Sequence, residues 1–320
     1  MTRWALMIMF AFSSIWLNCP ASFALEKVKV GTGIKGNPSY FLPLLAATEK
    51  GYWKEQGVEG EWVPFNSSVS MGQAAMGGAI DLGIHQLSGL LQVAARGITI
   101  IGVAKLAERA PWYIWVLKQS RIERPEDLNG AKIGVSRPGG IADGYAKALA
   151  KDLGLTKPIR IVGVGGVREM VAALRTGAID AVPLSSITMA RLEYEGVARK
   201  IVDVGAHSPQ SQDYLIVYAR EEAVKSKPDA LKRALKAMLE AGEFINPNPE
   251  WSVATIKKET GWPEPVSQSV YQLSRYSKDG VIDKEAIGKM RSFLIEYGLV
   301  SETKVPPVSQ LYTETLLPVQ

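Results

Sequence analysis

The stretch GGAIDLGI, residues 77–84, returns in a close variant as TGAIDAVPL, residues 176–184. The residues before each stretch also correspond, because MGQAAM (71–76) and MVAALR (170–175) both have the composition of an apolar helix. Each copy therefore predicts a helix, a glycine turn, an Ile-Asp pair and a short apolar strand. A repeated helix–turn–strand unit predicts that the chain folds into two lobes of similar layout.

The aspartates of this repeat, Asp81 and Asp180, have two interpretations. Each could contact a ligand, or each could accept backbone N–H groups where its strand begins, three residues after the glycine that ends the helix. We favour the second interpretation, because both residues occupy the same corner of a repeated structural unit.

Strand and helix patterns alternate outward from both copies of the repeat. Residues 27–34 alternate between polar and apolar side chains before a glycine-rich loop, and apolar helices and short strands follow as far as residue 118. The alternation restarts after the polar turn at 126–130, and a return strand at 214–220 precedes a helical remainder. Short strands that alternate with helices predict mostly parallel sheets covered on both faces, hence an α/β fold.

The chain has 320 residues, of which 47% are hydrophobic and 22% charged, and this length suits two domains. Residues 1–24 hold one charge, Arg3, then an apolar run and small residues ending at Ala24, a pattern typical of a secretory signal peptide. We expect cleavage near Ala24 and a periplasmic mature protein. Lipidation of Cys19 is the less favoured alternative, because the residues just before it are not small.

Composition and spacing exclude several classes of site. Cys19 is the only cysteine, so the mature chain has neither a disulfide nor a thiolate metal site. The formal charge of +5 becomes +4 without Arg3, and no run of Lys or Arg accompanies it, which argues against a nucleic-acid partner. His85 and His207 lack HExxH spacing and no G-x-S-x-G motif occurs, so we expect no metal site and no serine hydrolase.

Three phrases resemble one family of binding proteins. They are VGTGIKGNPSYFLPLLAATEKGYWKEQGVEGEWVPF (30–65), GQAAMGGAIDLGI (72–84) and RPEDLNGAKIGVSRPGG (124–140). In this order and spacing they resemble the periplasmic solute-binding proteins of ABC transporters for nitrate, sulfonates, taurine and thiamin pyrimidines. The similarity spans nearly the whole mature chain.

This resemblance implies a type II periplasmic binding fold, in which two crossing strands join two α/β lobes and the solute sits in the cleft between them. Lobe 1 would comprise residues 25–118 and 214–320, and lobe 2 residues 119–213. The crossings would fall near 118–120 and 212–215. The resemblance also implies a monomeric, non-catalytic receptor without a cofactor, which passes a small solute to an ABC permease and its ATPase.

Open α/β sheets bind ligands at the carboxyl ends of their strands, where loops lead into helix N-termini that attract anions. That rule selects five loops, at residues 34–40, 66–70, 85–88, 136–141 and 165–168. Ser136–Gly140 combines a hydroxyl, a guanidinium and two glycines, and Arg137 suits bidentate recognition of a carboxylate or sulfonate. Because no acidic residue occupies these loops, we expect a small organic anion, a sulfonate or carboxylate, with an aromatic or apolar body.

The predicted solute contacts come mainly from these loops, with one strand aromatic and one hydroxyl from the end of the second repeat. They are Lys35, Asn37, Tyr40, Asn66, Ser67, Ser68, His85, Gln86, Trp112, Ser136, Arg137, Gly139, Gly140, Gly166 and Ser185. Some have a second interpretation, because Asn and Ser also cap helices and strand aromatics also fill cores.

Two other functions stay open on the sequence alone. Enzymes of thiamin-pyrimidine synthesis and of a menaquinone route resemble the same family. The former carry a cysteine-rich iron-binding stretch, which a mature chain without cysteine lacks. A periplasmic sensory protein that docks on a membrane kinase would share every feature described above.

Overall fold

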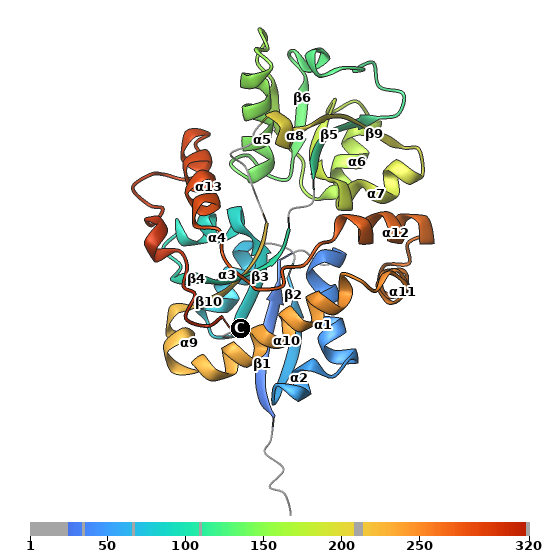
Figure 1. The fold of residues 1–320 in the computed structure, drawn as a ribbon. Coiled ribbons are helices and arrows are strands. Elements are labelled where there is room, and N and C mark those ends of the chain that lie inside the picture. The colour runs from blue at the N-terminus through green and yellow to red at the C-terminus, as the bar shows by residue number, and fades with distance from the viewer. Residues whose placement is uncertain (1–24, 34–35, 66–67, 109–110, 208–213, 318–320) are drawn as a thin grey trace, which may run out of the picture.

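The computed structural model describes residues 25–33, 36–65, 68–108, 111–207 and 214–317. These residues form the two α/β lobes that the sequence repeat predicts (Figure 1). One lobe carries the strands β1–β4 and β10, and the other carries β5–β9. The predicted signal peptide, 1–24, and part of the second predicted crossing, 212–215, lie outside the described residues.

The first lobe is built on a five-stranded sheet in the order β2-β1-β3-β10-β4. The strands β1 (Glu26–Thr32), β2 (Val58–Pro64) and β3 (Leu82–Gln86) are parallel. The strand β10 (Leu215–Arg220) runs antiparallel between β3 and β4 (Ile100–Ala107). The helices of this lobe are α1 (Pro38–Glu49), α2 (Tyr52–Glu55), α3 (Ser68–Met76), α4 (Leu87–Ala94), α9 (Glu221–Ser226) and α10 (Pro228–Ile245).

The second lobe repeats this layout. Its strands are β6 (Lys132–Val135) and β7 (Arg160–Gly163), which are parallel, and β5 (Trp112–Leu117), which runs antiparallel between β8 (Val182–Ser185) and β9 (Ala198–Asp203). The Gly134 N–H donates to the Ala181 carbonyl at 2.8 Å and joins the two groups in the order β7-β6-β8-β5-β9. The α-helices of this lobe are α5 (Ile141–Asp152), α6 (Val167–Arg175), α7 (Ser186–Tyr194) and α8 (Val204–His207).

The position of β5 differs from the predicted lobe boundary, which assigned residues 25–118 to the first lobe. Because β5 pairs with β8 and β9, the chain crosses to the second lobe between Ala107 and Trp112. Trp115 anchors the strand there, since its side chain is fully buried and its Nε1 donates to the Leu184 carbonyl at 2.9 Å. An apolar strand fits either sheet, so its composition alone could not assign it.

The two aspartates of the repeat make the same pair of backbone bonds. Asp81 Oδ2 accepts the Lys29 N–H at 2.8 Å, and the Asp81 N–H donates to the Lys29 carbonyl at 2.8 Å. Asp180 repeats both bonds with Lys132, again at 2.8 Å. Lys227 Nζ also contacts the Asp81 carboxylate. Each Asp ties its strand to the neighbouring parallel strand, which confirms the structural role predicted for the pair.

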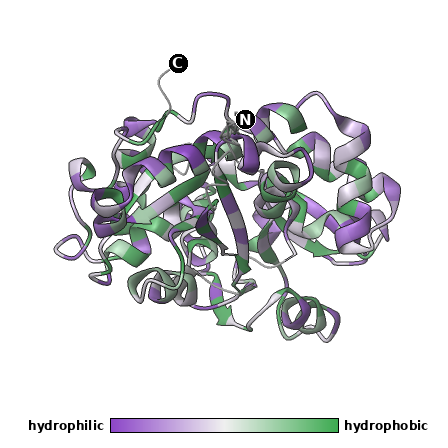
Figure 2. Cartoon of the chain, turned by 90° about the horizontal axis from the view of Figure 1, so that it is seen from below, coloured by the Kyte–Doolittle hydropathy of each residue, from purple (hydrophilic) through white to green (hydrophobic). Residues whose placement is uncertain are grey.

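Apolar side chains fill the space between sheets and helices in both lobes. Val28 and Val30 of β1 and Ile133 and Val135 of β6 are buried. The helices in Figure 2 show alternating purple and green bands, as expected of helices with one buried and one solvent-facing side. Within the described part of the chain, no helix is both long enough and apolar enough to cross a membrane.

The helical end of the chain packs against both lobes. The helices α11 (Pro249–Thr260) and α12 (Glu264–Leu273) lie on one side, where α12 packs against α7 of the second lobe (Figure 1). The helix α13 (Lys284–Glu296) lies on the other side and packs against both α4 and α5. Lys151 of α5 pairs with Glu296 of α13 at 2.7 Å. The C-terminal helices therefore span the seam between the lobes.

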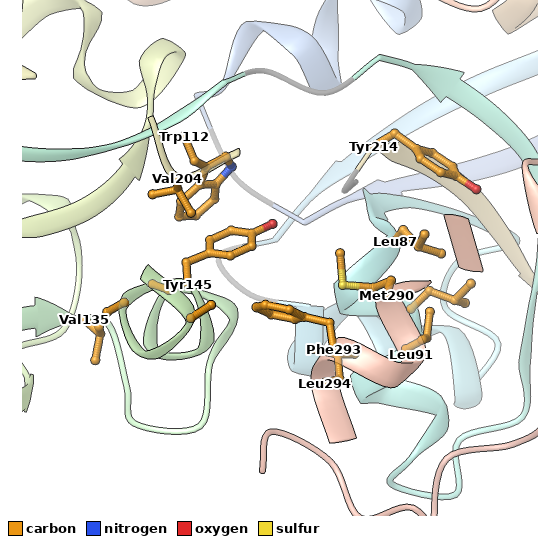
Figure 3. Close-up of a cluster of buried hydrophobic side chains, with 14 of the residues drawn as sticks. Leu87, Leu91, Trp112, Val135, Tyr145, Val204, Tyr214, Met290, Phe293 and Leu294 are labelled. Carbon is orange, nitrogen blue, oxygen red and sulfur yellow. The ribbon is translucent and has the colours of Figure 1, made fainter. Parts of the chain in front are cut away.

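Apolar side chains from both lobes meet at this seam (Figure 3). Tyr145 of α5 lies against Phe293 of α13, with ring centres 5.6 Å apart, and against Trp112 of β5 at 5.1 Å. Leu87 and Leu91 of α4 belong to the same cluster. We call these five residues the seam cluster. Its burial holds the lobes together in this structure.

Candidate functional site

A cavity of about 300 Å³ lies between the lobes, beside the seam cluster. We call it the solute cavity. Its wall contains seven of the predicted solute contacts: Asn37, Tyr40, Gln86, Trp112, Ser136, Gly166 and Ser185. The other lining residues were not singled out from the sequence: Ser39, Glu108, Ile141, Ala142, Gly165, Val167, Met170, Leu184, Ile187, Thr188, Tyr214 and Leu215.

The other predicted contacts are placed elsewhere or are not described. Lys35, Asn66 and Ser67 lie outside the described residues, and the side chain of Ser68 is not described either. Gly140 is the N-cap residue of α5, next to the lining residue Ile141. The remaining three are His85, Arg137 and Gly139, which are not part of the wall of the solute cavity.

Five helices begin at the wall of the solute cavity. Four of them place their N-cap residue in the wall and α5 places its first residue there, as follows: Asn37 of α1, Gln86 of α4, Gly166 of α6, Ser185 of α7 and Ile141 of α5. Each helix N-terminus presents N–H groups without an intrahelical partner and about half a positive charge. The wall therefore favours a negatively charged group.

The helices differ in how far their own residues satisfy these N–H groups. The side chains of Asn37 and Ser185 accept N–H groups of their own helices at 3.0 and 3.3 Å. The N-caps of α5 and α6 are Gly140 and Gly166, which have no side chain to do so. At α6 the carboxylate of Glu169 folds back, so that a Cβ at Gly166 would lie 2.7 Å from its Oε2. A carboxylate lies at the start of α5 as well, because Asp143 Oδ2 of its first turn accepts the Gly139 N–H at 2.8 Å. A bound anion would therefore meet a carboxylate of the helix itself at both N-termini.

His85 lies behind the wall rather than in it. A Cβ atom at Gly33 would lie 1.9 Å from its Cδ2, and one at Gly89 would lie 2.1 Å from its Nδ1, so the imidazole is wedged between two backbones. Burial lowers the pKa of His85 to about 4, against a smaller raising effect of its hydrogen bond with the Gln86 backbone. The neutral ring meets the lining residue Tyr40 edge to face, with ring centres 6.2 Å apart. The sequence predicted that His85 contacts the solute. In the structure His85 instead supports the cavity wall by packing on Tyr40.

Gly89→Ala is expected to lower the free energy of unfolding by about 1–3 kcal/mol, because the added methyl group overlaps the His85 ring. Gly288→Ala is the matched control, since the nearest atom to its added Cβ lies 4.0 Å away and alanine favours a helix. Urea denaturation of both variants tests this expectation. Equal stability of Gly89→Ala and the parent protein would show that the ring is not wedged.

Arg137 does not reach the solute cavity, although Ser136 does. The two residues lie in the bend after β6, where the chain turns toward α5, and their side chains line different cavities. The Arg137 Nη2 donates instead to Gln92 Oε1 of the first lobe, at 3.1 Å across the seam. Gly139 lies with Arg137 in the wall of a separate recess. Of this predicted loop, the structure thus brings Ser136 to the solute cavity and Arg137 to the recess.

Glu108 is the most consequential lining residue that the sequence analysis missed. Glu108 follows β4 in the first crossing, which leads to another strand. The rule applied to the sequence selects only loops that lead from a strand into a helix. Glu108 is the only charged residue among the described lining residues, and its carboxylate lies 2.5 Å from Lys105 Nζ. The sequence did contain a signal for Glu108, because this residue directly follows an apolar strand. A segment that crosses between the lobes at the end of such a strand must pass beside the cleft.

The other polar groups of the described wall are hydroxyls and amides. Ser185 Oγ and Thr188 Oγ1 lie 2.8 Å apart, and no histidine or lysine of the described wall accompanies them. No group of three or more His, Cys, Asp or Glu side chains within the described residues could hold a metal ion. The described wall thus offers hydrogen-bond donors and acceptors, aromatic surface and helix N-termini for reversible binding.

Comparisons with known proteins show which proteins this chain resembles in sequence and in fold. A Haemophilus influenzae protein named for thiamine biosynthesis is 24% identical over 292 residues, which cover 87% of this chain and 90% of the relative. The taurine-binding periplasmic protein of Escherichia coli is 25% identical over 283 residues, 84% of this chain and 86% of the relative. The crystal structure of the periplasmic aliphatic sulphonate binding protein SsuA from Escherichia coli superposes with a TM-score of 0.74 at 20% identity, covering 89% of this chain and 91% of that one.

These matches confirm the predicted periplasmic binding protein fold. The sequence model of one family, described as NMT1/THI5 like, matches residues 38–252, which is more than half of the chain. The matched range includes both copies of the GAID repeat and much of the wall of the solute cavity. The chain therefore belongs to the NMT1/THI5-like family.

Proposed function

We infer that this protein is a periplasmic receptor that binds one small solute between its lobes and delivers it to an ABC permease and its ATPase. The observation that carries this proposal is the convergence of helix N-termini from both lobes on one aromatic-walled cavity. The secretory pattern of residues 1–24 and the taurine-binding relative support a periplasmic location. The receptor acts as a monomer in this proposal.

The proposed solute is a small organic anion, a sulfonate or carboxylate with an apolar or aromatic body. No Lys or Arg occurs among the described lining residues, so recognition of the charge would rest on the helix N-termini. The hydroxyls of Ser136 and Thr188 would supply further hydrogen bonds. A volume of about 300 Å³ is at the lower end for ligand pockets and limits the solute to a small molecule.

Glu108 would contact a part of the solute other than its acid group. Its carboxylate already pairs with Lys105, so it adds little net negative charge to the cavity. A hydroxyl or amine on the solute would be a hydrogen-bond donor of the kind that this carboxylate accepts. An acid that carries such a donor is therefore preferred over a simple apolar acid.

A receptor is favoured over an enzyme by the chemistry of the described wall. The hydroxyls of Ser185 and Thr188 have no base beside them, and the mature chain has no cysteine. Because one relative is named for thiamine biosynthesis, the pyrimidines of that route are a second class of solute to be tested. Recovery of the bound compound unchanged, by mass spectrometry, would distinguish capture from turnover.

The proposal is tested by a thermal-shift screen of sulfonates, carboxylates and uncharged pyrimidines, followed by calorimetry of each hit. A compound that binds only the folded protein raises its stability by RT ln(1 + [L]/Kd). We expect the best compound to be an acid bound with one-to-one stoichiometry. An uncharged or cationic best compound would overturn the anion assignment, and conversion of the compound would overturn the receptor.

Trp112→Ala is expected to weaken solute binding at least ten-fold. Its side chain lines the cavity, is 8% exposed and packs edge to face on Tyr145, so it offers a fixed aromatic surface. Trp262→Ala is the matched control, because that residue lies outside the wall of the solute cavity. Calorimetry with the best compound measures both variants. Equal loss in the two would indicate a general effect on folding.

A further inference from the structure

A second cavity, of about 790 Å³ and open to solvent, lies at the seam. We call it the seam recess. Arg137 of the second lobe lines it together with Arg96, which follows α4, and Lys304, which follows α13. It shares no lining residue with the solute cavity. The bond from Arg137 to Gln92 crosses the recess wall, so the recess exists only while the lobes lie together.

The three cations of the seam recess have no carboxylate partner among the described residues. No Asp or Glu lines the recess, and none of the three takes part in an ion pair within the described chain. Burial and the neighbouring Arg96 both lower the pKa of Arg137, as expected of a guanidinium held near a like charge. All three side chains are exposed, so solvent screens their mutual repulsion, and an anion held between them would lower it further.

Helix ends offer a simpler explanation for part of this charge. The C-terminal ends of α4 and α13 lie at the recess, where Ala95 and Gly298 are lining residues. Each such end carries about half a negative charge, so the two together offset about one of the three positive charges. About two positive charges remain without an opposite charge in the described wall of the recess.

We propose that the seam recess binds a free oxyanion of the phosphate, sulfate or carboxylate class, which bridges Arg137 to Arg96 and Lys304 across the seam. Guanidinium groups suit such anions because they donate two parallel hydrogen bonds. Because the recess is complete only with the lobes together, a bound oxyanion favours the closed arrangement. It therefore acts as an effector site, separate from the solute cavity and independent of the identity of the solute.

Sulfate is the probe, measured by the melting temperature in mixtures of sodium sulfate and sodium chloride at constant ionic strength. We expect a saturable rise in the parent protein. In the double variant Arg96→Gln/Arg137→Gln the apparent affinity should fall at least ten-fold. The double variant Arg168→Gln/Arg175→Gln removes the same charge from exposed positions of α6 and should keep the rise. Lys304→Gln, at an exposed position, gives an independent test if the first variant folds poorly.

The outcomes separate this site from the solute cavity. Thr188→Ala should keep the saturable rise, because Thr188 lines the solute cavity but belongs neither to the seam recess nor to the seam cluster. A linear rise shared by every variant would be the general effect of sulfate on proteins and would overturn the proposal. A saturable rise that survives in Arg96→Gln/Arg137→Gln but disappears in Thr188→Ala would place the anion in the solute cavity and also overturn it.

Discussion

Phe293→Ala is expected to lower the free energy of unfolding by about 3–5 kcal/mol and to let the lobes separate in the solute-free protein. Phe293 is fully buried, and its ring faces Tyr145 of the second lobe at 5.6 Å. A Cβ at Gly144 would lie 3.1 Å from Phe293 Cε1, which shows how closely α5 and α13 pack. The truncated side chain leaves a cavity at the seam between the lobes. The lost packing therefore destabilises both the folded state and the closed arrangement of the lobes.

Denaturant unfolding measures the loss of stability, and small-angle scattering measures the separation as a larger radius of gyration. Leu231→Ala is the control, because Leu231 is fully buried in α10, which packs against elements of the first lobe. It should lose about 2–5 kcal/mol without a change in radius. An unchanged radius for Phe293→Ala would show that the seam cluster stabilises the helix α13 but not closure.

Asp81→Ala is expected to lower the free energy of unfolding by about 2–4 kcal/mol. The substitution leaves the Lys29 N–H without its acceptor, where burial makes an unpaired donor costly, and it leaves Lys227 without its carboxylate. Lys227 is about one third exposed, so screening by solvent reduces its share of the loss.

Asp180→Ala is the internal control for Asp81→Ala. It removes the same bond, to the Lys132 N–H at 2.8 Å, at a corner where no ion pair with a lysine side chain is present in the described residues. We expect a loss of about 1–2 kcal/mol from thermal or urea unfolding. Equal losses at the two positions would show that Lys227 contributes nothing. No loss at either would refute the structural role of the repeat.

The repeat made most of the fold predictable. A glycine followed by Ile-Asp specifies a helix end, a turn and a strand start through local backbone chemistry, so two copies indicated two lobes. The assignment of β5 to the first lobe was wrong for a related reason. Nothing within the sequence of an apolar strand indicates which sheet the strand joins. Trp115 belongs to the second lobe only through partners such as Leu184, which are distant in the sequence.

The solute cavity was predictable where backbone geometry decides it. Helix N-termini follow from strand–loop–helix patterns, and the N-cap residues Asn37, Gln86 and Gly166 were selected in this way. Side-chain direction was less accessible, as Ser136 and Arg137 show by pointing to different cavities. Contacts that depend on the closed seam, such as Tyr145 against Phe293, leave no pattern in either segment alone.

The place of β10 at the interior of the first sheet constrains the order in which the protein assembles. Ile216 pairs with His85 on one side and with Lys105 on the other, so the strands β3 and β4 stay unjoined until residues beyond 214 have arrived. The second lobe, by contrast, is drawn from the continuous segment 112–207. The second lobe can thus fold before the first lobe, although its segment is synthesised later. Until then the first lobe keeps two open strand edges, those of β3 and β4. For an exported chain, such a delay leaves the amino-terminal part unfolded for longer, which is the state in which a polypeptide crosses a membrane through a narrow channel.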